Sequence, residues 1–473
     1  MMTASAARIR SVEDLRGRHA LVLGLARSGI AASRFLADAG ALVTAYDRRP
    51  AVEMSDPIAA LEGRPVRLAL GVDEADAARL IADADLLVTS PSVSLRFPTT
   101  DAWLRQALND AEKRGAEIVS EVELFLRLTR ARILGITGTK GKTTTASLVA
   151  AILEASGLPT VLGGNIGTPL VERSMELGPD TWAVLELSEL QLPTISRGAD
   201  VALYTNIGAD HLDRHGTVDA YRAVKARLAE LSMPDGRVVL NHDDAGCRAL
   251  ADHLPRPALA WYGEDRPGAG RDEAWVEDGW LIVHGERLMP AEDVPLPGRH
   301  MRANVLGAAL ASSLAGASGE TVAGAIRAFP GVPHRLELIA ERGDVRWVND
   351  SQATIPVAAI AGLEAFDAPI VLIAGGRGKG LDYASFADAI AERAHAAVLI
   401  GESADELAAL IGKRAPVRRA ATMDEAVVAA AGLARPGDVV LLSPAAASFD
   451  MFVDYAARGD AFRAAVERLE VER

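Results

Sequence analysis

Short apolar runs of strand length recur along the whole chain, and each is followed by a glycine turn and an alanine-rich stretch with helical periodicity. The first run spans residues 19–24, a helical stretch follows it, and the next run spans residues 41–46. Runs of this kind are typical of buried parallel strands joined by crossover helices. The pattern therefore predicts an α/β fold.

Further runs of the same kind form three series. Proline- and glycine-rich stretches around residues 290–298 and 329–333 interrupt the strand and helix patterns. A chain of 473 residues is long enough for about three domains. We therefore expect domains over residues 1–119, 120–331 and 332–473. The later predicted strands span residues 85–90, 132–137, 183–187, 201–205, 237–241, 345–348, 369–374, 397–400 and 438–442.

The composition argues against several classes of protein. Lys and Arg number 50 against 64 Asp and Glu, and only 9 Phe, 6 Trp and 6 Tyr are present. This balance argues against a nucleic-acid-binding surface with stacking aromatic side chains. The single cysteine, Cys247, cannot form an internal disulfide or a cysteine-rich zinc site. No stretch reaches the ~18 apolar residues of a membrane-spanning helix and no signal-peptide pattern opens the chain, so we expect a cytoplasmic protein without membrane insertion.

The strongest motif is Gly-Thr-Lys-Gly-Lys-Thr-Thr, which follows the predicted strand at residues 132–137 and opens a helical pattern. Glycines let backbone N–H groups close on phosphate oxygens, Lys142 can reach the terminal phosphates, and Thr143 offers a hydroxyl to Mg²⁺. Only six of the 50 basic residues are lysines, so a lysine here is informative, because arginine cannot replace its compact ammonium. The motif predicts ATP binding by Gly138, Thr139, Lys140, Gly141, Lys142, Thr143 and Thr144.

A second glycine turn, Gly24 to Gly29, follows the first predicted strand. It is similar to a dinucleotide-binding fingerprint, although Ala26 stands where that fingerprint has a glycine. Asp47 ends the next predicted strand, where it is either a plain loop carboxylate or an acceptor for a ribose or base. Two nucleotide sites in one chain predict a two-substrate enzyme.

Polar side chains also follow two strands of the central series. Glu186 ends one predicted strand and His211 follows the next. Because the carboxyl ends of parallel strands meet at one edge of a sheet, both side chains can reach an Mg²⁺ ion that Thr143 helps to hold. Lys225 lies in a helical pattern, and its spacing alone indicates an ordinary surface lysine.

Eight short motifs occur in a fixed order along the chain. They are Gly-Thr-Lys-Gly-Lys-Thr-Thr, Gly164-Asn165-Ile-Gly167, Glu186-Leu-Ser, Asp210-His211-Leu-Asp213, Tyr221-Arg-Ala-Val-Lys225, Pro333-His334-Arg335, Asn349-Asp350-Ser351 and Leu442-Ser443-Pro444. Together they resemble the Mur ligases, and the resemblance covers nearly the whole chain. It implies an α/β protein of three domains: a Rossmann-like N-terminal domain for a UDP substrate, a central P-loop ATPase-like domain, and a Rossmann-like C-terminal domain for an amino acid.

The resemblance also implies roles for single residues. The catalytic set would be Lys142, Glu186, His211 and Lys225. ATP would contact the P-loop, Asn304, Arg335 and Asp350, and the UDP substrate would contact Arg27, Ser28, Asp47, Asn165 and His211. The amino acid would contact Thr354, Lys379, Ser448 and Tyr455. Thr143 and Glu186 would hold one Mg²⁺ ion, and His211 and Lys225 a second. Lys225 would act as an N-carboxylated (carbamate) side chain, whose anionic oxygens suit Mg²⁺.

The implied reaction belongs to peptidoglycan precursor synthesis. ATP would phosphorylate the carboxylate of UDP-N-acetylmuramoyl-L-alanine to an acyl phosphate, and the amine of glutamate would attack it, in an enzyme expected to be a monomer. Gln352 stands where the family has a lysine, which leaves D-Glu and L-Glu both open.

Three other functions compete with this one. A folylpolyglutamate-type ligase shares the P-loop and the third domain but does not need the N-terminal domain. A nucleotide-regulated binding module without turnover is disfavoured by the presence of Glu186, His211 and Lys225. A nicotinamide dehydrogenase is favoured only by the incomplete glycine fingerprint at the first turn.

Overall fold

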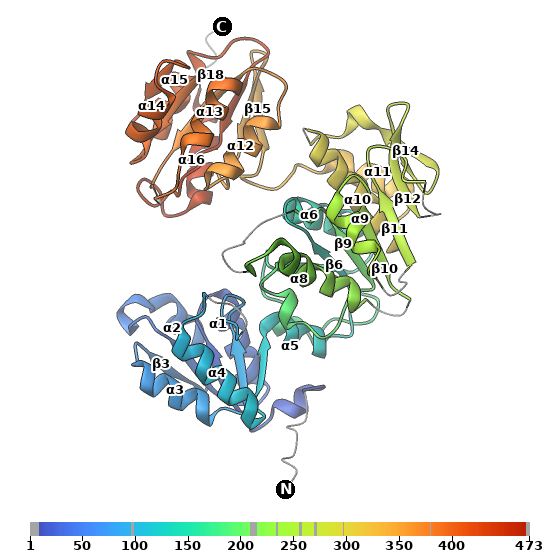
Figure 1. Ribbon diagram of the computed structural model, residues 1–473, viewed down its shortest axis with the longest axis vertical. Helices are drawn as coiled ribbons and strands as arrows, with labels where there is room; N and C mark the ends of the chain where they lie inside the picture. Colours follow the sequence, from blue (N-terminus) through green and yellow to red (C-terminus); the bar gives the residue numbers. More distant parts are fainter. Residues whose placement is uncertain are drawn as a thin grey trace. The chain divides into compact units, whose positions relative to one another are not determined.

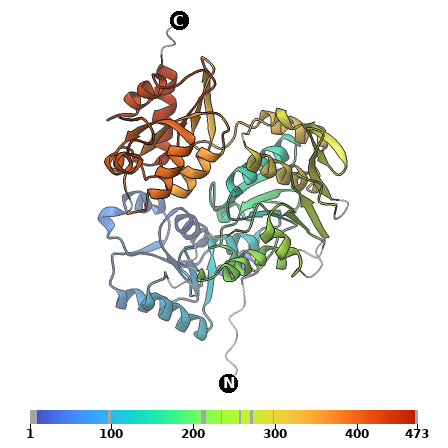
Figure 2. The same ribbon diagram turned by 45° about the horizontal axis from the view of Figure 1, so that its top comes forward.

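The computed structural model describes residues 9–95, 99–208, 215–232, 235–254, 258–268, 272–296, 298–378 and 380–469. The chain forms two compact units, which are seen in two views (Figures 1 and 2). The first unit comprises residues 1–291 and 303–325, and the second comprises residues 292–302 and 326–473. Helices α10 (Arg299–Leu314) and α11 (Gly319–Ala328) each cross this division.

The first sheet of the first unit has five parallel strands in the order β3-β2-β1-β4-β5. Its strands are β1 (His19–Leu23), β2 (Leu42–Asp47), β3 (Val66–Leu70), β4 (Leu86–Thr89) and β5 (Glu117–Ser120). The helices are α1 (Arg27–Asp38), α2 (Ser55–Leu61), α3 (Glu74–Asp83), α4 (Ala102–Arg114) and α5 (Glu121–Leu128). Alternate residues of β1 enter different hydrophobic clusters, one shared with α1 and α5 and the other with α3 and α4. The continuous apolar run of this strand is therefore explained by burial on both faces.

The second sheet, also in the first unit, has nine strands in the order β14-β13-β12-β11-β10-β9-β6-β8-β7. The strands are β6 (Arg132–Thr137), β7 (Thr160–Gly164), β8 (Trp182–Glu186), β9 (Val201–Tyr204), β10 (Arg237–Asn241), β11 (Ala258–Tyr262), β12 (Glu273–Glu277), β13 (Trp280–Val283) and β14 (Glu286–Pro290). All neighbouring strands from β7 to β12 pair in parallel, whereas β13 pairs antiparallel with both β12 and β14. The helices are α6 (Lys142–Ala155), α8 (Val218–Glu230) and α9 (Ala245–Ala251), with the short turns η3 (Val171–Arg173) and η4 (Leu192–Thr194).

The sheet of the second unit has six strands in the order β15-β16-β20-β17-β18-β19. The strands are β15 (Glu337–Arg342), β16 (Val345–Asn349), β17 (Ile370–Gly375), β18 (Ala394–Ile400), β19 (Val417–Arg419) and β20 (Val439–Leu442). The helices are α12 (Pro356–Glu364), α13 (Ala384–Arg393), α14 (Ala404–Ile411), α15 (Met423–Ala431) and α16 (Tyr455–Arg468). Ile370 and Leu372 of β17 join the cluster with α12, α13 and α14, whereas Val371 and Ile373 join the cluster with α15 and α16.

Each sheet has a point where the strand order reverses direction, and the loops at these points open crevices for ligands. In the second sheet β6 lies between β9 and β8, so the P-loop after β6 meets the loops that follow both neighbours. In the third sheet β20 lies between β16 and β17, which gathers the Asp350 and Ser443 segments at one edge. The fold therefore positions the candidate site residues before any side-chain contact is considered.

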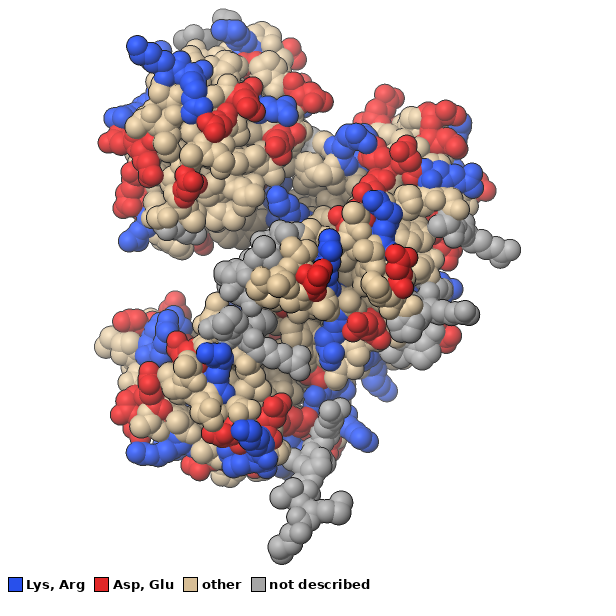
Figure 3. Space-filling view, viewed as in Figure 1, with Lys and Arg blue, Asp and Glu red and all other residues tan. Residues whose placement is uncertain are grey.

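The predicted α/β class is confirmed, and the predicted strands at residues 132–137 and 237–241 coincide with β6 and β10. The three-domain division at residues 119 and 331 stays a prediction. Acidic and basic side chains are interspersed on the face in view of both units (Figure 3). Within the described ranges, no helix has the length and apolar character needed to cross a membrane.

Candidate active site

The P-loop connects β6 to α6, and glycine is required at two of its positions. Gly138 has φ 151° and Gly141 has φ 84°, both outside the range of ordinary L side chains. A Cβ on Gly138 would lie 1.9 Å from Oγ1 of Thr205, and one on Gly141 would lie 2.7 Å from Oδ1 of Asn304. The loop therefore packs tightly on the end of β9 and on α10, and the predicted adenine contact Asn304 lies against it.

Side chains after β9 bind the backbone of the P-loop. Oγ1 of Thr205 donates to the Lys140 carbonyl at 2.6 Å, and Nδ2 of Asn206 donates to the same oxygen at 3.0 Å. The Lys140 N–H in turn donates to Oδ1 of Asn206 at 2.9 Å. These contacts fix the loop conformation from the neighbouring strand, and sequence reasoning had assigned no role to Thr205 or Asn206. Their place at a strand end was the signal that could have identified them.

Lys142 is the first residue of α6, and its ammonium bends back over the loop. Nζ donates to the carbonyls of Gly138 at 2.9 Å and Thr139 at 3.0 Å. Helix α6 also directs its N-terminal dipole toward this loop, with Thr143 and Thr144 in the first turn. The geometry thus gives the positive end of a helix and a lysine, which together suit a phosphate chain.

Glu186 ends β8 with a carboxylate that is 1% exposed. Its Oε1 accepts a hydrogen bond from Nδ2 of Asn165 at 2.7 Å, while Oε2 is buried and has no hydrogen-bond partner among the described residues. Asn165 follows Gly164, whose Cβ, if present, would lie 2.2 Å from the Glu186 carbonyl oxygen. The predicted metal ligand and the predicted substrate contact are therefore held together, with one carboxylate oxygen available to a cation.

Lys225 lies on α8 and is completely buried, so the surface position indicated by its spacing alone was wrong. Nζ donates to the Gly138 carbonyl at 3.0 Å and to Oγ1 of Thr137 at 3.2 Å. Oγ1 of Thr137 donates to the Leu187 carbonyl, one residue beyond Glu186, at 2.8 Å. A hydrogen-bonded path therefore joins Lys225, the start of the P-loop and the end of β8.

The donor types fit Mg²⁺, which prefers hard oxygen ligands from carboxylates and hydroxyls. The unpartnered oxygen of Glu186 and the hydroxyl of Thr143 are of this kind. In the part of the chain that the structure describes, no group of three or more His, Cys, Asp or Glu side chains gathers as a ready ligand set. His211 lies outside the described residues, so the predicted second ion site is described only at Lys225.

The predicted UDP contacts lie at the first glycine turn. Arg27 and Ser28 open α1, and Nη1 of Arg27 donates to the Gly167 carbonyl at 3.3 Å. This contact joins Arg27 to the loop of the second sheet that carries Asn165, two residues earlier. The structure thus brings together predicted substrate contacts from two separate sheets of the first unit.

Asp47 is buried, and it is engaged by its own neighbours. Oδ2 accepts the Leu25 N–H at 2.9 Å, and both oxygens accept hydrogen bonds from the Arg49 guanidinium. Burial alone would raise the pKa of this carboxyl, but the bonds from Arg49 and Leu25 outweigh it and lower the pKa to about 2. Asp47 therefore closes the turn that precedes Arg27 and Ser28, and its contact with a ribose or base stays a prediction.

In the second unit, Arg335 lies between two residues in the left-handed region, His334 with φ 63° and Leu336 with φ 44°. Such conformations cost energy in non-glycine residues and are common at ligand sites. The Leu336 N–H donates to Oδ1 of Asp350 at 3.3 Å, and Oγ of Ser443 donates to Oδ2 at 2.8 Å. Burial raises the pKa of Asp350 to about 7, although these hydrogen bonds oppose the shift. The predicted phosphate and ribose contacts are thus neighbours at the open end of the antiparallel β15–β16 pair, Arg335 just before β15 and Asp350 just after β16.

The predicted amino-acid contacts are described in part. Ser448 is buried, Thr354 is half-buried and Tyr455, at the start of α16, is exposed, whereas Lys379 lies outside the described residues. Oγ of Ser351 donates to the Tyr455 carbonyl at 2.7 Å, which joins the Asn-Asp-Ser motif to α16. Ser448 and Tyr455 therefore belong to segments that converge on this motif.

Arg458 was missed by sequence reasoning. Its guanidinium is 1% exposed and donates to Oγ and the carbonyl of Ser351, both at 2.9 Å, and to the Ala446 carbonyl at 3.0 Å. Burial lowers its pKa from the usual value to about 10. It ties the Asn-Asp-Ser motif to the loop that carries Ser448. An arginine on an alanine-rich helix gives no local signal of this role.

Comparison with known proteins agrees with this geometry. Residues 136–312 match the Mur ligase middle domain, and residues 334–446 match the Mur ligase glutamate ligase domain. The UDP-N-acetylmuramoylalanine--D-glutamate ligase of Solibacter usitatus is 39% identical over 461 residues, which cover 96% of this chain and 99% of that protein. The protein of the same name from Anaeromyxobacter dehalogenans is 42% identical over 466 residues, covering 95% and 97%.

Solved structures share the fold at low identity. The UDP-N-acetylmuramate-alanine ligase MurC of Thermotoga maritima has a TM-score of 0.59 at 16% identity and covers 95% of this chain and 99% of its own. A pseudomurein peptide ligase type C from Methanothermus fervidus has a TM-score of 0.55 at 18% identity, covering 96% and 100%. The domain matches and the identity over almost the whole length confirm the resemblance seen in the motifs: the chain belongs to the Mur ligase family.

Proposed function

We propose that the protein is an ATP-dependent ligase that adds D-glutamate to UDP-N-acetylmuramoyl-L-alanine during peptidoglycan precursor synthesis. The observation that carries the proposal is Glu186, a buried carboxylate with one oxygen on Asn165 and the other unpartnered among the described residues, beside a P-loop. The full-length relatives carry this activity in their names. The folylpolyglutamate, dehydrogenase and binding-module alternatives lose support, because the match to relatives that are named as D-glutamate ligases covers 96% of the chain and so includes the N-terminal sheet.

Lys142 and the N-terminus of α6 support the first step, in which the alanine carboxylate attacks the γ-phosphate of ATP. The reaction forms an acyl phosphate and releases ADP, and negative charge is redistributed over the phosphate oxygens. An ammonium and backbone N–H groups held in a fixed loop lower the energy of that charge. In the proposed ATP site, Gly138 to Thr144 contact the phosphates, Asn304 the adenine, Arg335 a phosphate and Asp350 the ribose.

Thr143 and Glu186 are the proposed ligands of one Mg²⁺ ion, and His211 and Lys225 of a second. Bound Mg²⁺ neutralises phosphate charge and orients the two reacting groups. Lys225 as an ammonium could not ligate a cation, so we propose that it acts as a carbamate. Its full burial beside Thr137 and Gly138 supports this assignment, because the site is screened from water.

Amide formation is the second step. The amine of glutamate attacks the acyl phosphate, and the tetrahedral intermediate collapses with loss of phosphate. Arg27, Ser28, Asp47 and Asn165 are the proposed contacts of the UDP substrate. For the amino acid we propose Thr354, Ser448, Tyr455 and Lys379, although the last lies outside the described residues. Cytoplasmic location and a monomeric state stay predictions.

A second candidate is the ligase that adds L-Glu to the same acceptor. It is favoured by Gln352, whose Oε1 is buried and has no hydrogen-bond partner among the described residues. A neutral amide there recognises a glutamate carboxylate differently from a lysine, and stereochemistry depends on such contacts.

Phosphate release from ATP in the presence of UDP-N-acetylmuramoyl-L-alanine tests the function, with D-Glu and L-Glu compared at equal concentrations. We expect release that depends on all three substrates and is faster with D-Glu. Release that needs no amino acid would contradict the ligase assignment, and faster release with L-Glu would select the second candidate.

A further inference from the structure

Helix α5 links the first sheet to the second, and it buries two carboxylates within eight residues. Glu121 is 4% exposed and Glu123 is fully buried, and of the whole helix only Arg127 is not buried. A buried carboxylate is costly unless it is paired and hydrogen-bonded, so both side chains must have partners. Oε1 of Glu121 accepts the Val171 N–H, at the start of η3, at 3.0 Å.

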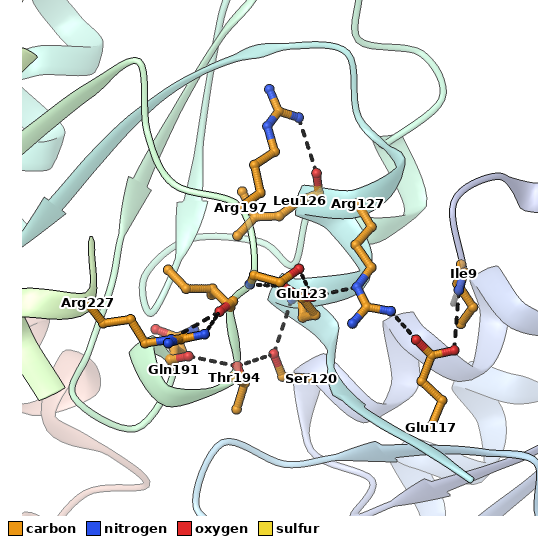
Figure 4. Close-up of polar contacts among 12 residues, drawn as sticks. Ile9, Glu117, Ser120, Glu123, Leu126, Arg127, Gln191, Thr194, Arg197 and Arg227 are labelled. Carbon is orange, nitrogen blue, oxygen red and sulfur yellow. Dashed lines mark hydrogen bonds and ion pairs between the residues drawn. The ribbon is translucent and has the colours of Figure 1, made fainter. Parts of the chain in front are cut away.

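The partners of Glu123 lie on two different segments (Figure 4). Arg127, one turn further along α5, donates to it from Nε and also bonds Glu117 of β5. On the other side, the backbone N–H of Ser196 donates to Oε2 at 2.8 Å and the Ser196 hydroxyl donates to Oε1. Ser196 belongs to residues 187–200, which connect β8 to β9 and which we name the β8–β9 loop.

Two further contacts bind the β8–β9 loop to α5. Oγ of Ser120, the N-cap of α5, lies 2.8 Å from Oγ1 of Thr194. The Arg197 guanidinium donates to the carbonyls of Leu126 at 3.2 Å, Thr129 at 2.8 Å and Ala131 at 2.9 Å, at the other end of the helix. The loop is therefore held along the whole length of α5, with Glu123 in the middle (Figure 4).

The same loop reaches the proposed metal ligands. It begins directly after Glu186, and its first carbonyl, at Leu187, is bonded through Thr137 to Lys225. Within it, Oε1 of Gln191 accepts both the N–H and the hydroxyl of Ser188, at 3.0 and 3.1 Å.

The loop also contacts the helix that carries Lys225. Arg227, two residues further along α8, donates from Nε and Nη2 to the Ile195 carbonyl at 3.1 and 2.7 Å. Displacement of this short loop would therefore move the end of β8 and α8 relative to each other.

We infer that Glu123 is a positioning residue for the phosphoryl-transfer site: it fixes the β8–β9 loop on α5, and the loop sets the separation of Glu186 and Lys225. The inference rests on the proposed function for its kinetic consequence. Buried Leu192 and Ile195 hold the loop by apolar packing, which is non-directional and so stabilises the loop without fixing its exact position along α5. The hydrogen bonds between Ser196 and Glu123 are directional, so they fix the position of the loop relative to α5. Mutation of residues that hold metal ligands in place without contacting the metal commonly lowers metal affinity or activity 10- to 100-fold.

Glu117 provides a matched control. Its side chain bonds the same arginine as Glu123, and the other partners of that side chain among the described residues are Arg18 and the Ile9 N–H, neither of which belongs to the β8–β9 loop. Glu117→Gln and Glu123→Gln therefore remove the same charge from the same cation. Ser196→Ala provides a milder loop-side change, because it removes only the hydroxyl contact to Glu123.

The experiment measures kcat and the Mg²⁺ concentration for half-maximal turnover, together with melting temperature and hydrogen exchange of residues 187–196 in the free protein. For Glu123→Gln we expect about a tenfold rise in the Mg²⁺ requirement, a lower kcat and faster exchange of the loop. Ser196→Ala should change the Mg²⁺ requirement, kcat and loop exchange in the same directions but by smaller amounts. Glu117→Gln should lower only the melting temperature.

Two results would overturn the inference. One is a Glu123→Gln enzyme that is less stable but keeps the wild-type kcat and Mg²⁺ requirement at a temperature where it is folded. The other is an equal kinetic change in Glu117→Gln. If the wild-type protein shows no ligase activity, the proposed function fails by itself. Hydrogen exchange and Mg²⁺ binding by calorimetry then still distinguish Glu123→Gln from Glu117→Gln.

Discussion

The first unit contains two turns of the same design, and they differ in how the helix-opening basic residue is used. Both follow a central strand, both are rich in glycine, and each helix begins with a basic residue, Arg27 in α1 and Lys142 in α6. Arg27 is exposed and extends to the Gly167 carbonyl of another sheet. Lys142 bends back onto the carbonyls of its own loop.

The residues that face each turn explain this difference. At the first turn the neighbouring strand supplies a carboxylate, Asp47, which takes the Leu25 N–H and balances the positive charge of Arg49. At the second turn the neighbouring strand supplies Thr205 and Asn206, and Lys225 joins Lys142 at the Gly138 carbonyl. The carboxylate and guanidinium groups at the first turn suit polar groups of a sugar or base, whereas the Lys142 ammonium and the N-terminus of α6 at the second turn suit phosphates.

The largest effect should follow removal of Lys142. Lys142→Ala should lower kcat at least 10³-fold with little change in melting temperature, because the ammonium stabilises transferring phosphate and contributes little packing. Arg27→Ala, at the equivalent helix position, should instead raise the KM of the UDP substrate. The rate of phosphate release, measured while the concentration of each substrate is varied in turn, gives kcat and the KM of each substrate. A near-wild-type kcat in Lys142→Ala would refute its role in phosphate transfer.

Lys225 tests whether the second turn uses a lysine as an anion. Lys225→Arg keeps the positive charge but cannot form a carbamate, and we expect kcat to fall at least 10²-fold. In the wild-type protein, labelled bicarbonate should produce a carbamate signal by NMR that the variant lacks. A fully active arginine variant would exclude the carbamate.

Alanine substitutions compare the packing of the two turns. A Cβ on Gly29 would lie 1.8 Å from the Gly24 carbonyl oxygen, a backbone atom, so Gly29→Ala should lower the free energy of unfolding by about 2–3 kcal/mol. Gly138→Ala would press on the Thr205 side chain and should damage kcat more than stability. Chemical denaturation measures the change in stability and steady-state kinetics the change in kcat. Equal losses of stability and of kcat in Gly29→Ala and Gly138→Ala would show that the two turns are equivalent.

The smallest effect concerns pH and Asp47. Its folded-state pKa of about 2 lies below the ordinary value of 3.8, so its stabilisation is complete above that value and is lost as the pH falls toward 2. With allowance for the half-exposed Arg49, we expect Asp47→Asn to cost about 1–2 kcal/mol at neutral pH. The difference in unfolding free energy between the two proteins should shrink in acid, and a pH-independent difference would remove the ionic explanation.

Features encoded by adjacent residues were predictable from the sequence. The P-loop, the strand that precedes it and the end of β8 depend on short apolar runs and glycine spacing, and they lie where expected. The antiparallel strands β13 and β14 had not been identified.

Contacts between distant residues were not predictable in this way. Lys225 is buried because α8 packs on β6, which is 88 residues away at the Lys225–Thr137 contact. The role of Arg458 depends on Ser351, 107 residues away. No local pattern records such pairs, so only the family resemblance drew attention to Lys225, and nothing drew attention to Arg458.

Gly164 has a consequence for the variation that this chain can accept. A methyl group there would lie 2.2 Å from the Glu186 carbonyl oxygen, and the residue has φ 92°. Every mutation of this codon that changes the amino acid would therefore push the segment carrying Asn165 away from β8. Natural selection could remove such a variant even though Gly164 itself has no chemical group to contribute, and the position would remain glycine while the surrounding residues drift.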